Sequence, residues 1–169
     1  MGCISFANFA VLVNGSPSSF FSASRGIRQG CPLSPLLFIL VIEGLSLLIE
    51  DAKQNGVIKG IQISATLSLT HLLFVDDVIL FGMGTYEDWI AFKVILDIFC
   101  DASGMMINLD KSCFLHYDLD DALLSRISGF MPYRFAHLNL GFTYLGFYLK
   151  PSGYLIKDWN WLMSHTPIL

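Results

Sequence analysis

Two adjacent acidic residues, Asp76 and Asp77, interrupt an otherwise apolar run at residues 69–82. Burying a carboxylate without a partner costs several kcal/mol, so we expect the pair at the solvated tip of a buried hairpin with strands at 69–75 and 78–81. Two carboxylates at such a tip can hold hard divalent cations, which prefer oxygen ligands. A pair of magnesium ions held by carboxylates is the usual machinery of phosphoryl and nucleotidyl transfer. The simpler alternative is that Asp-Asp only forms a solvated turn.

A second stretch whose residue types could bind a ligand is the loop S-R-G-I-R-Q-G-C-P-L-S-P at residues 24–35. Its glycines, Gly30 among them, permit close approach of the backbone to a ligand. Arg25 and Arg28 can face phosphates, and Gln29 offers both a donor and an acceptor. The loop leads into the start of a helix, where free amides and the helix dipole favour anions. The alternative is a proline-rich loop that only caps a core helix.

Periodicity and turn residues predict the elements that position these side chains. Helical spacing of apolar residues begins near Ser34, where Pro35 suits the first turn, and stops at Asn55-Gly56. A second helix, 86–102, follows Thr85 as a suitable N-cap and stops at Ser103-Gly104. The other expected elements are a hairpin turning at Asn14-Gly15 between a strand in 4–13 and a return strand starting at 20–21, strands at 57–63, 106–108, 112–117 and 142–149, and an amphipathic helix at 118–129. Helices and antiparallel strands mix without a β-α-β rhythm, which predicts the α+β class.

The composition narrows the classes of protein. The chain has 169 residues, of which 54% are hydrophobic and 14% are charged, against a usual charged share of roughly 25%. It is too apolar for disorder. A membrane-spanning helix needs roughly 18 apolar residues, and the best run, 33–49, contains Pro35, Glu43 and Gly44 and falls short. The net charge of −4 argues against a broad basic face for nucleic acid.

The N-terminus and the cysteines bear on the compartment. The first apolar stretch has no basic region before it, so we expect no signal peptide. The four cysteines form no close pair, which favours a reduced, intracellular location, nuclear or cytoplasmic, and no membrane.

Taken together, the motifs resemble one family. R-G-I-R-Q-G-C-P-L-S-P-L-L-F at 25–38, F-V-D-D at 74–77, S-G-M-M-I-N-L-D-K-S at 103–112 and F-T-Y-L-G-F-Y-L at 142–149 follow one another in the order seen in reverse transcriptases of non-LTR (LINE-type) retrotransposons, particularly those of plants. K-D-W-N-W-L at 157–162 resembles the start of the next segment. The resemblance implies an α+β polymerase palm-like antiparallel sheet with packed helices. The fingers and most of the thumb are expected to be missing, with a partial palm domain at 1–162 and a truncated tail at 163–169.

The resemblance also implies roles for individual residues. The expected cofactor is a pair of Mg²⁺ or Mn²⁺ ions, and the expected partners are an RNA template, a DNA primer and deoxynucleotides, with the oligomeric state left open. For Lys111 the alternative is an exposed lysine at a strand start, and for the primer-gripping hairpin it is core packing, which can hold at the same time. The implied assignments are Asp76 and Asp77 as metal ligands and catalytic residues, Lys111 near the departing pyrophosphate, Arg25, Arg28, Gln29 and Gly30 at the nucleotide and template, and Tyr144, Leu145 and Gly146 as the primer-gripping hairpin.

One element of the family's site has no counterpart in the sequence. The family uses three aspartates, and the first lies on a strand upstream of the segment where this chain begins. Neither Asp51 nor Asp88 is well placed to replace it. We therefore expect a partial RNA-directed DNA polymerase domain with little or no activity as this polypeptide alone. The alternative is a catalytically inactive retrotransposon remnant that lacks the first metal-binding aspartate.

Overall fold

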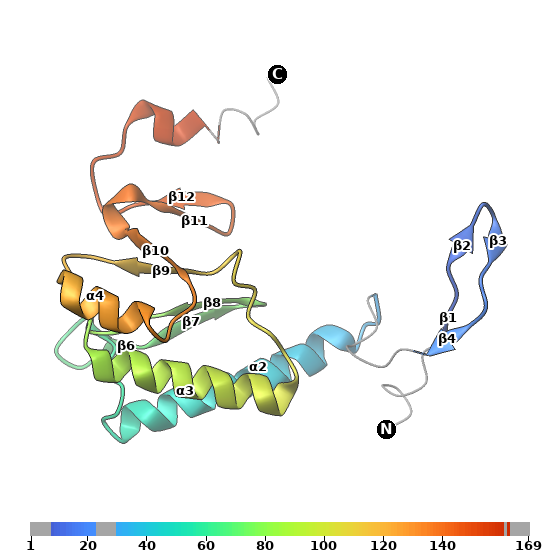
Figure 1. Cartoon of the computed structure of the whole chain (residues 1–169), viewed down its shortest axis with the longest axis horizontal. Helices are drawn as coiled ribbons and strands as arrows, with labels where there is room; N and C mark the ends of the chain where they lie inside the picture. The colour runs from blue at the N-terminus through green and yellow to red at the C-terminus, as the bar shows by residue number, and fades with distance from the viewer. Residues whose placement is uncertain (1–7, 23–29, 161, 163–169) are drawn as a thin grey trace. The chain divides into compact units, whose positions relative to one another are not determined.

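The computed structural model describes residues 8–22, 30–160 and 162 of the chain (Figure 1). The chain forms two compact units, Met1–Leu47 and Leu48–Leu169, with the boundary inside the longest helix.

The first unit contains a two-stranded ribbon. Strand β1 (Asn8–Phe9) pairs antiparallel with β4 (Phe21–Ser22), and β2 (Leu12–Val13) pairs with β3 (Ser16–Pro17). Asn14 and Gly15, which connect β2 to β3, have φ values of 49° and 80°. A type I′ hairpin turn needs two positive φ values in succession, which Asn-Gly adopts readily. The turn predicted at Asn14-Gly15 is therefore confirmed, but the return strand already starts at Ser16 and not at 20–21, and residues 4–7 of the first predicted strand lie outside the described residues.

The long helix α2 (Ser34–Gln54) begins and ends where the sequence predicts. Pro35 lies in its first turn, where a missing amide donor is harmless. At the other end Gly56 takes a φ of 70° and donates its N–H to the Lys53 carbonyl, which ends the helix. Among the helices of the described residues, none is both long and apolar enough to cross a membrane.

The second unit is built around α3 (Tyr86–Ser103), which also matches its prediction closely. The Thr85 hydroxyl accepts the N–H of Asp88 at 3.3 Å, which is the expected N-cap. Gly104 ends the helix in the left-handed region with a φ of 71°. The buried face of α3 consists of Phe92, Ile95, Leu96 and Phe99, spaced at the helical period.

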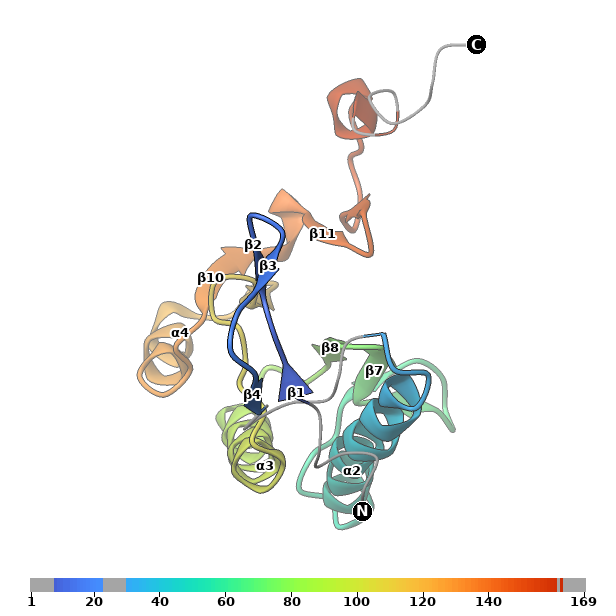
Figure 2. The same cartoon turned by 90° about the vertical axis from the view of Figure 1, so that its right-hand side faces the viewer.

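A β-α-β unit packs against α3 through α4 (Asp121–Ser128), which lies beside α3 in Figures 1 and 2. Strand β9 (Cys113–His116) pairs in parallel with β10 (Arg134–His137), and α4 is the crossover. Phe114, Ile127 and Met131 form the buried cluster between them. The expectation of no β-α-β arrangement is wrong here. The sequence did not indicate β10, because this strand is only four residues long and reads R-F-A-H, without a clear apolar alternation.

The remaining strands form separate two-stranded sheets. The strand predicted at 57–63 is reduced to Ile61–Gln62, and the strand predicted at 106–108 is absent because the Asn108 side chain and carbonyl accept N–H bonds in a turn. The segment 142–149 is a hairpin and not one strand. The elements are β5 (Ile61–Gln62) with β6 (Ser68–Leu69), β7 (His71–Phe74) with β8 (Asp77–Leu80), β11 (Phe142–Tyr144) with β12 (Phe147–Leu149), and the short 3₁₀ helices η1 (Leu138–Leu140) and η2 (Ile156–Trp159). The α+β class is confirmed.

Candidate functional site

The hairpin that carries the aspartate pair is formed by β7 and β8. Its ladder runs from His71 opposite Leu80 to Phe74 opposite Asp77. The two-residue turn consists of Val75 and Asp76, so Asp77 is already the first residue of β8. The predicted hairpin is confirmed, with its turn one residue earlier than expected. Both Asp76 and Asp77 are exposed, as two metal-binding carboxylates need to be.

The turn is held in an uncommon backbone conformation. Val75 has a φ of 52°. A β-branched residue in the left-handed region is strained by an amount on the order of 1–3 kcal/mol. Such strain concentrates at functional sites, where the surrounding structure has to fix a side chain in one place. The strain is therefore a second feature, beside the two carboxylates, that indicates a functional site at this turn.

One face of the hairpin is open, which corrects the expectation of a buried hairpin. Leu72 is 45% exposed and Phe74 is 54% exposed, and both lie on the same face as Asp77. On the other face, Leu73 and Val78 are partly buried. A two-stranded sheet has two faces, and the apolar run gave no indication that only one of them is covered within the described residues.

The charges around the pair leave it available to a cation. No described residue donates a hydrogen bond or forms an ion pair with the carboxylates of Asp76 and Asp77. Carboxylate oxygens are hard ligands, so the donor set fits Mg²⁺ or Mn²⁺. Within the described ranges, however, no three His, Cys, Asp or Glu side chains come together as a metal-binding group.

Asp88 lies close in sequence to the hairpin but has a structural task. Its side chain is 2% exposed. One carboxylate oxygen accepts the Met83 N–H at 3.0 Å, and the other accepts the Lys59 N–H at 3.4 Å. Both oxygens are thus used by the backbone. Asp51 is exposed on α2.

Of the residues predicted at the nucleotide and template, only Gly30 is placed. Arg25, Arg28 and Gln29 lie outside the described residues. Gly30 is exposed, has a φ of 78° and would have open space around an added Cβ atom. These properties are compatible with close approach of a ligand, and the pocket itself stays a prediction.

Lys111 lies in an exposed turn before β9. Its backbone N–H donates to the Asn108 carbonyl at 3.3 Å, and no ion pair of its ammonium is found among the described residues. Its role near a pyrophosphate stays a prediction.

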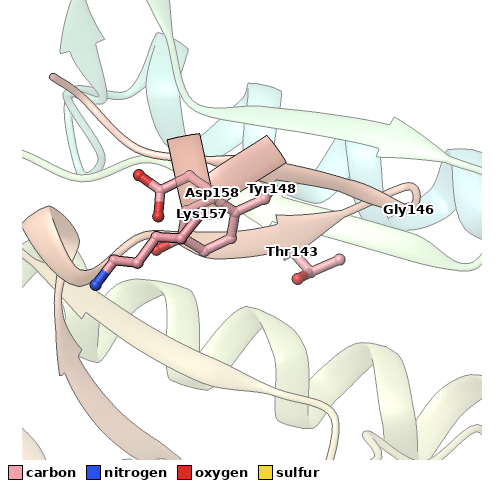
Figure 3. A pocket seen from close by; sticks show the side chains of 5 residues that line it. All are labelled: Thr143, Gly146, Tyr148, Lys157 and Asp158. Atoms are coloured by element: carbon pink, nitrogen blue, oxygen red, sulfur yellow. The ribbon is translucent and has the colours of Figure 1, made fainter. Parts of the chain in front are cut away.

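Of the three residues predicted to grip the primer, Leu145 and Gly146 form the hairpin turn between β11 and β12, and Tyr144 is the last residue of β11. Leu145 and Gly146 have φ values of 51° and 81°, the pattern of a two-residue turn that matches strand twist. A pocket of about 240 Å³ lies against this hairpin (Figure 3). It is lined by Thr143, Gly146, Tyr148, Lys157 and Asp158.

Sequence reasoning missed the polar residues that η2 brings to this pocket. Asp158 accepts both the Lys150 ammonium at 2.9 Å and the Leu155 N–H at 2.8 Å. These two donors hold the pKa of Asp158 below its usual value, and the Leu155 N–H has the larger effect. Asp158 therefore compensates the charge of Lys150, and Lys157 is the cation among the residues that line the pocket. The K-D pair of the 157–162 motif was the available signal.

Comparison with known proteins gives one family and two relatives. The family described as "Reverse transcriptase (RNA-dependent DNA polymerase)" matches residues 3–149. An uncharacterized mitochondrial protein of Arabidopsis thaliana is 48% identical over 67 residues, 39% of this chain and 55% of that protein. The "Transposon TX1 uncharacterized 149 kDa protein" of Xenopus laevis is 30% identical over 155 residues, 90% of this chain and 11% of that protein. The chain therefore spans about half of one relative and about a ninth of the other.

Proposed function

This chain belongs to the reverse transcriptase (RNA-dependent DNA polymerase) family, and we propose that it supplies part of the palm of a retrotransposon enzyme. In that role it takes part in adding deoxynucleotides to the 3′ end of a DNA primer on an RNA template. The observation that supports this most is that Asp76 and Asp77 are exposed at a strained hairpin turn and have no hydrogen-bond or ion-pair partner among the described residues. We assign residues 1–162 to the partial palm and 163–169 to a tail.

The carboxylates of Asp76 and Asp77 are the proposed ligands of the divalent ions. When bound, a pair of Mg²⁺ or Mn²⁺ ions activates the primer hydroxyl and neutralises charge on the leaving pyrophosphate. The left-handed conformation of Val75 fixes the direction in which the two aspartates leave the backbone. Because Asp88 is occupied by two backbone N–H groups, we exclude it from the ligand set.

The remaining assignments follow the same proposal. Lys111 stabilises the charge of the departing pyrophosphate, since its ammonium lies on an exposed turn without an ion pair among the described residues. Gln29 and Gly30 contact nucleotide and template, with Arg25 and Arg28 on phosphates. The turn Tyr144-Leu145-Gly146 contacts the primer strand.

We further propose that the 169-residue chain alone extends a primer poorly or not at all, because its described residues bring no third metal-binding side chain to the pair. The alternative from another class is an inactive remnant of a transposable element.

Two measurements on the purified chain test the proposed function. In a fluorescence-anisotropy titration, the chain should bind a DNA primer annealed to an RNA template, with an affinity that falls as salt rises. In a primer-extension assay with Mg²⁺ and deoxynucleotides, it should give no product. Absence of primer–template binding would contradict the family role. Magnesium-dependent extension that disappears in Asp76→Ala would instead overturn the proposed inactivity.

A further inference from the structure

Tyr148 on β12 reaches outside its own hairpin. Its phenol O–H donates a hydrogen bond to the carbonyl oxygen of Leu140, eight residues earlier in η1. In the ladder Tyr148 lies opposite Thr143 of β11. The side chain therefore joins the hairpin to the segment that connects it to β10.

The ring of the same residue packs on Gly141. A Cβ atom added at Gly141 would clash with the Tyr148 ring, because the two would be closer than real Cβ contacts occur. Gly141 also has a φ of 75°, which side chains other than glycine rarely adopt. Glycine at this position thus lets the Tyr148 ring lie directly against the backbone.

The linker between β10 and β11 is otherwise short. It consists of η1 and Gly141, and its first turn is capped by His137, whose Nδ1 accepts the Asn139 N–H at 3.2 Å. Leu145 and Leu149 of the hairpin remain 40% and 37% exposed and no hairpin residue is fully buried, so packing alone holds the direction of the hairpin only in part. The ion pair of Lys150 with Asp158 ties the hairpin to η2, and not to β10.

We propose that Tyr148 is a positioning residue. Its hydrogen bond to Leu140 and its ring contact with Gly141 fix the orientation of β11–β12 relative to the β9–α4–β10 unit. They thereby set where the Tyr144-Leu145-Gly146 turn lies. The effect of this orientation on the primer strand rests on the proposed function.

The orientation of the β11–β12 hairpin can be measured without an activity assay. Residual dipolar couplings of backbone amides in β11–β12 and in α4 should fit a single alignment tensor in the wild-type chain. In Tyr148→Phe, which keeps the ring and removes only the O–H, the hairpin amides should need a separate tensor of smaller magnitude. The matched control is Tyr117→Phe, which removes the O–H of a tyrosine that is 57% exposed. A single shared tensor in Tyr148→Phe overturns the positioning role.

A second variant and a binding readout separate this proposal from the proposed function. Gly141→Ala should loosen the hairpin at least as much as Tyr148→Phe, because it displaces the ring as well as the hydrogen bond. Tyr148→Phe should bind the DNA primer on an RNA template roughly threefold to tenfold more weakly, because losing one orienting hydrogen bond lowers by about that factor the population of the hairpin orientation that binds. Equal affinities of Tyr148→Phe and wild type overturn the link to the primer. If the wild-type chain binds no primer–template, the proposed function fails while the dipolar couplings still decide the positioning role.

Discussion

Replacing Asp88 by alanine should destabilise the chain strongly, because its carboxylate is buried and accepts two backbone N–H groups. A hydrogen bond to a charged group contributes about 1.5–3 kcal/mol. The bond from Met83 at 3.0 Å should lie within that range, and the bond from Lys59 at 3.4 Å near its lower end. The expected loss for Asp88→Ala is therefore about 3–5 kcal/mol in the free energy of unfolding. Asp88→Asn, which keeps one acceptor oxygen, should lose about half of that.

Urea denaturation followed by tryptophan fluorescence measures this loss. Trp89 is a suitable reporter of unfolding, since the centroid of its ring lies 4.6 Å from that of Phe114 and 5.4 Å from that of Phe92. With a dependence on urea of about 1–3 kcal/mol/M, a loss of 3 kcal/mol moves the midpoint down by about 1–3 M. Asp97→Ala is the matched control on the same helix. It removes an exposed ion pair with Lys93, which should matter by less than about 1 kcal/mol.

Two results would refute this reasoning about Asp88. A loss below about 1 kcal/mol in Asp88→Ala would mean that the buried hydrogen bonds do not hold the loops before α3. A loss of Mn²⁺ binding in a folded Asp88→Asn chain would place the carboxylate in the metal site, contrary to its contacts.

Three further outcomes are expected. Thr85→Ala should destabilise the chain by about 1 kcal/mol in urea denaturation through loss of the N-cap of α3, and a change below about 0.3 kcal/mol would count against that cap. Val75→Gly should leave the unfolding free energy unchanged or raise it by up to about 1 kcal/mol, because relief of the left-handed strain offsets the added chain entropy; a loss above about 1 kcal/mol would show that Val75 is not strained. The Leu155 N–H and the Lys150 ammonium hold the pKa of Asp158 below its usual value of 3.8, so these two contacts of the carboxylate should contribute fully above that pH and be lost as pH falls through the lowered pKa. Thermal melting of wild type and Asp158→Asn should converge in that acidic range, and a constant difference down to the lowest pH would contradict it.

Local signals in the sequence predicted the helices well. Thr85 caps the start of α3 and Gly104 ends it, each through contacts within one helical turn. Their residue types were therefore enough to predict where the helix begins and ends. Asn14 and Gly15 likewise set the first hairpin through their own φ values. Strand β10 was missed, since its pairing with β9 depends on residues about twenty positions away and its own four residues carry no pattern.

The candidate site was predictable in part. The position of Asp76 and Asp77 at a hairpin followed from the cost of burying charge, but which face is open did not. The buried role of Asp88 depends on Lys59, which is 29 residues away in sequence. The contact of Tyr148 with Gly141 depends on the register of β11 with β12, which the apolar segment 142–149 left undetermined.

Metal binding by the aspartate pair tests the central claim most directly. In a titration of the isotope-labelled chain with Mn²⁺, paramagnetic broadening should begin at the amide signals of residues 74–78 and strengthen when a deoxynucleoside triphosphate is added, because Mg²⁺-type sites use substrate phosphates as ligands. Asp76→Asn and Asp77→Asn should each weaken this broadening, and Asp51→Asn, at an exposed position on α2, should leave it unchanged. Broadening at residues 74–78 that is the same in wild type and in the Asp76→Asn, Asp77→Asn double variant would contradict the account.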